Sequence, residues 1–105
     1  MTRTRRRRMG NNEFERVAKY LLVKYINSRN IAKLGEQFKP ITEAEVYVVW
    51  CCKILQNNKA LLSTNRPDGM YYELTYNGSK DQLYLDAYKK EENVCFEDIV
   101  SLVSI

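Results

Sequence analysis

Hydrophobic residues between positions 13 and 28 recur with the spacing of an amphipathic helix. The apolar positions that follow this spacing are Phe14, Val17, Ala18, Leu21, Leu22 and Tyr25, which together form one face of a helix. Asn12 is suited to cap this helix, with Glu15 three residues later in the capping-box position. We expect the apolar face to pack on a sheet, because an isolated sheet needs a cover to be stable. The alternative is a helix that binds a partner.

The chain then changes from a helical to an extended pattern. Residues 29–45 predict a connector with a short helical piece, which Gly35 weakens and Pro40 ends. Residues 46–55 are rich in β-branched and aromatic side chains, as strands are. This run is apolar on both faces, which is typical of a central strand that is covered on both sides. We therefore expect Trp50 to be mostly buried.

Three further strands are predicted at residues 59–64, 70–76 and 82–88, separated by turns at 56–58, 66–69 and 77–78. Asn77-Gly78 suits a two-residue type I′ turn, which would pair Tyr76 with Ser79, Tyr72 with Leu83, and Met70 with Leu85. The alternation then separates an apolar face from a polar, tyrosine-rich face, and a slip of one residue would mix the two. The apolar face holds Met70, Tyr72, Leu74, Tyr76, Leu83 and Leu85.

The last residues carry a second helical pattern. Phe96, Ile99, Val100 and Val103 have helical spacing, although their β-branched content also allows a strand. The fold class that follows is α+β: an N-terminal helix packed on a four-stranded, mainly antiparallel sheet, with a short C-terminal helix or strand. With 105 residues, the chain has room for one domain, which we place at residues 11–105.

The formal net charge of +4 comes from the first eight residues. This segment holds five of the seventeen basic residues, so residues 9–105 carry twelve basic and thirteen acidic side chains. Residues 1–10 are either a disordered basic arm or an artefact of the assigned start, since Met9 also suits a beginning. An arm would contact phosphates, which gives an alternative function as a nucleic-acid-associated protein that uses Arg3, Arg5, Arg6, Arg7 and Arg8.

The composition argues against several kinds of chemistry. The chain has no histidine, which excludes Ser-His-Asp and Cys-His catalysis and every zinc site that contains His. Cys51, Cys52 and Cys95 form no C-x-x-C pair, so we interpret them as reduced, buried small hydrophobes. The acidic residues have no metal-binding spacing and the glycines form no phosphate loop. We predict no enzyme, no metal and no cofactor, and no apolar run reaches the roughly 18 residues of a membrane span.

The polar face of the last hairpin is the candidate binding surface. It would expose Tyr71, Tyr84 and Tyr88 among Glu73, Lys80 and Asp86, a combination typical of protein-binding hot spots. The alternative is tyrosine pairing across strands that only stabilises the sheet. Stacking on nucleic-acid bases would require more basic neighbours. Glu73 and Asp86 are not directly opposed in the predicted pairing, so we interpret them as surface charges rather than an acid–base pair.

Residues 46–95 also carry a resemblance. The strings VYVVW, LQNNKALLST, DGMYYE, TYNG and YLDAYKK resemble a family of small uncharacterised proteins from tailed phages and prophages of Gram-positive bacteria. The resemblance brings no activity with it. It implies a non-enzymatic accessory protein in the bacterial cytoplasm that binds, and inhibits or modulates, a host or phage protein. Inhibition of a defence nuclease, as by anti-CRISPR proteins, is one specific form of that role.

Overall fold

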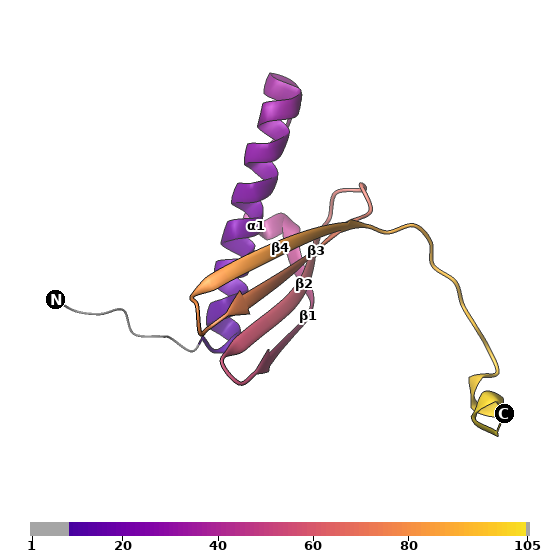
Figure 1. Ribbon diagram of the computed structural model, residues 1–105. Coiled ribbons are helices and arrows are strands. Elements are labelled where there is room, and N and C mark those ends of the chain that lie inside the picture. Colours follow the sequence, from indigo (N-terminus) through magenta and orange to yellow (C-terminus); the bar gives the residue numbers. More distant parts are fainter. Residues whose placement is uncertain (1–8, 105) are drawn as a thin grey trace.

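The computed structural model describes residues 9–104 and has the α+β architecture that the pattern predicts. One long helix, α1, packs against one face of an antiparallel sheet whose strands follow in chain order, as Figure 1 shows. The elements are α1 (Asn11–Leu34), β1 (Val46–Ile54), β2 (Asn57–Thr64), β3 (Met70–Asn77) and β4 (Gln82–Lys89), with short 3-10 turns at Gly35–Gln37, Glu43–Glu45 and Ile99–Ser104. The predictions for Arg3, Arg5, Arg6, Arg7 and Arg8 lie outside the described residues.

Helix α1 begins earlier and ends later than the apolar pattern predicts. Gly10, not Asn12, stands at its start: the Gly10 amide donates to the Glu13 carboxylate at 3.2 Å, and the Phe14 amide donates to the Gly10 carbonyl at 2.9 Å. The helix runs on to Leu34 because no strong breaker occurs before Gly35, whose φ of 60° ends it. Residues 29–34 of the predicted connector therefore belong to α1, whereas residues 35–45 hold only short turns, as predicted.

The core lies between α1 and the sheet face that it covers. Helix residues Phe14, Ala18, Leu22 and Ile26 are buried against Val46, Ala60, Leu62, Tyr72, Leu74 and Tyr76 of the sheet. The sheet members include Tyr72, Leu74 and Tyr76 of the face that the sequence predicts to be apolar. Helix α1 packs most closely on β1 and β2, and Leu83 and Leu85 of β4 are only partly buried.

The side chains of Asn27 and Arg66 hold the connector after α1 to the rest of the domain. The Asn27 side chain accepts from the Ile41 amide at 2.9 Å and donates to the Ile41 carbonyl at 3.1 Å. Arg66, in the β2–β3 turn, donates from Nε to the Glu45 carboxylate at 2.8 Å. These contacts fix the point where β1 begins.

Strand β1 is an edge strand, not the central strand that its sequence predicts. A β-bulge adds to this difference: Val48 pairs with Leu62 and Trp50 pairs with Leu61, which leaves Val49 without a partner. The extra residue reverses the alternation beyond it. Trp50 therefore leaves the core face, and it is 42% exposed, so the prediction that it is buried is wrong.

The hairpin of β3 and β4 keeps its predicted faces but not its predicted register. Tyr76 pairs with Leu83, and Asn77 with Gln82, so the loop has four residues instead of two. Neither Asn77 nor Gly78 has the positive φ of a type I′ turn. The Asn77 side chain instead accepts the Ser79 amide at 3.0 Å, which builds a longer turn. The register differs by an even number of residues, so the side chains within β3 and β4 stay on their predicted faces.

The C-terminal residues form an arm that leaves the body, in yellow in Figure 1. From here on, the arm means residues 90–104, and not the basic segment at the N-terminus. All of these residues are exposed, and the short helical turn Ile99–Ser104 lies near the end of the arm. The Lys90 amide donates to the Gly69 carbonyl at 2.8 Å where the arm departs. Cys95 of the arm and Cys52 of β1 are exposed, so the prediction that all three cysteines are buried is wrong. None of the helices in the described part of the chain is long and apolar enough to cross a membrane.

Candidate protein-binding surface

The sheet face opposite α1, which we call the open face, carries most of the candidate residues. Strand pairing places its side chains in rows that cross the four strands. The rows are Tyr47–Ser63–Tyr71–Tyr88, Trp50–Leu61–Glu73–Asp86 and Cys52–Lys59–Thr75–Tyr84. No helix of the described chain covers this face, and Figure 1 shows α1 behind the sheet. The rows therefore form one continuous surface.

Aromatic side chains stand at both sides of the open face. Tyr47 and Trp50 come from β1, whereas Tyr84 and Tyr88 come from β4 on the opposite edge. All four are exposed, with exposed fractions between 42% and 55%. The Tyr84 hydroxyl donates to the Gln82 side chain at 2.7 Å. The sheet thus holds large amphipathic rings in water. Ordering these rings against a partner would have a small conformational cost.

The centre of the open face is a small charged cluster. Lys59 lies 3.5 Å from the Glu73 carboxylate, and their side chains are 46% and 22% exposed. Asp86 pairs directly with Glu73 across β3 and β4, so the prediction that these carboxylates are not opposed is wrong, because the longer loop shifts the register. With one lysine and two carboxylates, the three rows carry a net charge of about −1.

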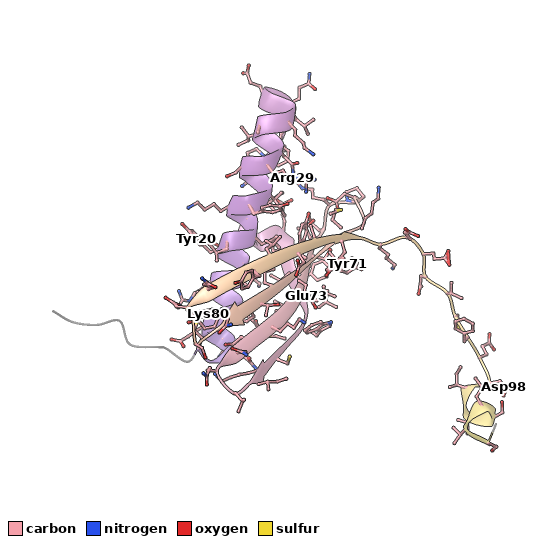
Figure 2. The ribbon with its side chains drawn as sticks, in the orientation of Figure 1. Tyr20, Arg29, Tyr71, Glu73, Lys80 and Asp98 are labelled. Carbon is pink, nitrogen blue, oxygen red and sulfur yellow. The ribbon has the colours of Figure 1, made fainter. Side chains whose placement is uncertain are left out.

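The structure brings five of the six predicted binding residues together. Tyr71 and Tyr88 are a cross-strand pair, Glu73 and Asp86 are the next, and Tyr84 stands opposite Thr75. Lys80 is separate: it lies exposed in the β3–β4 turn beyond the ends of the strands, as Figure 2 shows. Figure 2 also shows Tyr71 and Glu73 side by side on the sheet.

Sequence reasoning missed the edge of the open face that β1 supplies, which contributes one residue to each of the three rows. Tyr47, Val49, Trp50 and Ile54 are all exposed there. The apolar pattern of residues 46–55 predicts a strand covered on both faces, yet the sequence predicts one long helix, and one helix covers only one face of a sheet. The presence of a single long helix is therefore the sequence signal that one face of the sheet stays uncovered. The bulge at Val49 had none, because it depends on pairing with β2.

The open face contains a hollow, but its side chains are poorly suited to catalysis. A hollow of about 230 Å³ lies beside Cys52, Ile54, Lys59 and Thr75. On the opposite side of β1, burial raises the pKa of the Cys51 thiol above its ordinary value, with the Glu15 carboxylate adding to the effect. A raised pKa keeps the thiol protonated and unreactive. The described residues hold no group of three His, Cys, Asp or Glu side chains that could bind a metal ion.

The comparison with known families gives one match. A family described as a family of unknown function (DUF6275) matches residues 15–98, which span most of α1, the whole sheet and the first part of the arm. Neither the curated proteins nor the solved structures include a significant match to the chain.

Proposed function

We propose that this chain, which belongs to the DUF6275 family, acts without catalysis by binding another protein through its open face. The observation that supports this function is the set of four exposed aromatic side chains, Tyr47, Trp50, Tyr84 and Tyr88, held on one rigid sheet. These rings stand on the two edge strands and flank the Lys59–Glu73 ion pair, so the face offers a partner apolar contacts on both sides of a polar centre. Tyrosine and tryptophan are also the residues that contribute most to protein interfaces.

The charge of the open face favours protein over nucleic acid. A sheet that stacks bases combines aromatic rings with basic side chains that contact the backbone phosphates. Here Lys59 is paired with Glu73, and Asp86 adds a further negative charge. Nucleic-acid binding by Arg3, Arg5, Arg6, Arg7 and Arg8 stays a prediction, and it would be distinguished by steep weakening with salt.

The partner that we propose is a host or phage protein in the cytoplasm of a bacterium, as the resemblance to phage proteins implies. The chain would then act by occupying a surface that its target needs. Inhibition of a defence complex is the most specific version of this role. The open face would block a site on the target by covering it, because the face presents aromatic rings and an ion pair rather than a reactive group.

Site-specific photo-crosslinking in bacterial cells tests this function. The full chain would carry a photoreactive amino acid in place of Tyr84 on the open face or, as a matched control, Tyr20 on α1. These tyrosines are 55% and 54% exposed, and Figure 2 shows Tyr20 on the side of α1 away from the sheet. We expect a defined crosslinked protein from position 84 and none from position 20. Equal crosslinking from both positions, or none from position 84, would contradict the proposal.

The purified partner then gives a quantitative test. Tyr84→Ala should weaken its binding by about 5- to 30-fold, which corresponds to roughly 1–2 kcal/mol. Tyr20→Ala should leave the affinity unchanged, because this tyrosine lies outside the open face. Unchanged affinity of the Tyr84 variant would remove the open face from the interface.

A further inference from the structure

Helix α1 covers only part of the sheet face on which it packs. A helix with its side chains is about 10 Å wide, whereas four strands spaced about 4.8 Å apart present a wider surface. Because α1 packs most closely on β1 and β2, Leu83 and Leu85 of β4 are only partly buried. The flank of α1 that faces β3 and β4 is therefore an incomplete layer, and it lies on the opposite side of the sheet from the open face.

Two hollows lie along this flank. The larger, of about 390 Å³, is lined by Val17 and Leu21 of α1 and by Tyr76 and Leu83 of the sheet, with the exposed side chains of Glu13, Arg16 and Asp81 at its rim. The smaller, of about 170 Å³, lies further along between Tyr25 of α1 and Met70 and Tyr72 of β3. Both have a helix wall and a sheet wall, which is the place where a second helical segment would pack in a two-layer α+β domain.

The arm is an apolar segment that lacks a cover. Its exposed large apolar side chains are Val94, Phe96, Ile99, Val100, Leu102 and Val103, with exposed fractions between 52% and 83%. Phe96, Ile99, Val100 and Val103 have the spacing of one helix face. Soluble proteins rarely expose a contiguous apolar set of this size unless it meets another surface.

We propose that two copies of this chain exchange arms, so that the arm of each copy packs in the α1–β4 flank of the other. The arm departs after Lys90 and leads away from its own body, as Figure 1 shows, so it is placed to reach a second molecule. Each chain then contributes one segment and one flank, and a twofold pair satisfies both. The apolar face of the arm would then cover Val17, Leu21 and Leu83, and Arg16 would lie beside the arm at the rim of the larger hollow.

Disulfide trapping tests this contact with the full chain. Cys51→Ser and Cys52→Ser leave the exposed Cys95 of the arm as the single native thiol. Adding Arg16→Cys at the rim should give a covalent dimer under mild oxidation, and reductant should reverse it. Tyr84→Cys on the open face is the control, and it should give no crosslink with Cys95. A monomer with an internal disulfide would place the arm on its own body, and a dimer through Tyr84→Cys would place it on the open face; either result overturns the proposal.

The mass of the chain in solution, measured by sedimentation over a range of concentrations, gives the second test. Wild type should be dimeric, and Phe96→Asp with Val100→Asp should weaken the dimer at least tenfold. Ser101→Asp places one negative charge on an exposed arm residue outside the apolar face and should preserve the dimer. The substituted residues are exposed, so the far-UV spectrum should not change. A wild-type monomer at every concentration, or a dimer that the double variant leaves intact, overturns arm exchange without affecting the proposed function, which crosslinking at position 84 tests separately.

Discussion

The contrast between Tyr72 and Tyr84 tests how the faces of the hairpin are assigned. Both residues are tyrosines in neighbouring strands, yet Tyr72 is 4% exposed and Tyr84 is 55% exposed. The Tyr72 ring also meets the Tyr25 ring edge-on, with centroids 6.5 Å apart. Replacing each by alanine removes the same atoms from two different environments, so any difference in stability comes from the face.

The structure sets the size of the expected difference. Removal of a buried aromatic side chain costs about 3–5 kcal/mol, and an aromatic pair contributes about 0.5–1.5 kcal/mol beyond burial. We therefore expect Tyr72→Ala to lower the free energy of unfolding by about 3–4 kcal/mol, a loss of roughly 12–30 °C in Tm for a domain of this size. Tyr84→Ala should cost about 1 kcal/mol or less, because half of its surface already meets water.

Urea unfolding followed by far-UV circular dichroism measures both values. Tyr84→Phe is the matched control, because it keeps the ring and removes only the hydroxyl that donates to Gln82. Equal losses for Tyr72→Ala and Tyr84→Ala would refute the assignment of faces. A larger loss for Tyr84→Ala would show that something covers the open face within a single copy.

Three further predictions concern backbone space and pH. Gly78→Ala should lower stability by about 1–3 kcal/mol in urea unfolding, because an added Cβ would collide with the Gln56 carbonyl oxygen; an unchanged midpoint would contradict this close approach. Burial raises the pKa of Tyr72 above 10, so its neutral form stabilises the fold below pH 10 and this contribution is lost as pH rises further. Tyr72→Phe should therefore lose less stability than wild type between pH 9 and 11, and identical curves would contradict this. The hydrogen bond from Arg66 lowers the pKa of Glu45 below 4.5, so its contribution is present above pH 4.5 and is lost as pH falls through the lowered pKa. The Tm gap between wild type and Glu45→Gln should accordingly close in acid, and a gap that persists at pH 2 would contradict the pairing.

The sequence alone determined which side chains of the last hairpin face the core. The alternation of Tyr71, Tyr72, Glu73 and Leu74 has a period of two, and this period survives any even change of register. Tyr72 and Leu74 are therefore buried and Tyr84 is exposed, as predicted, although the loop is longer than Asn77-Gly78 alone suggests. The presence of one long amphipathic helix was equally readable, since local spacing specifies it.

Only the tertiary structure decided the places of Trp50, Glu73 and the arm. The exposure of Trp50 depends on a bulge at Val49 and on the edge position of β1, and both are properties of pairing with a distant strand. The pairing of Glu73 with Asp86 depends on the turn, where the Asn77 side chain competes with the backbone for amide donors. The arm has the spacing of a packed helix but is exposed along its whole length, because local spacing specifies an apolar face without specifying what that face meets.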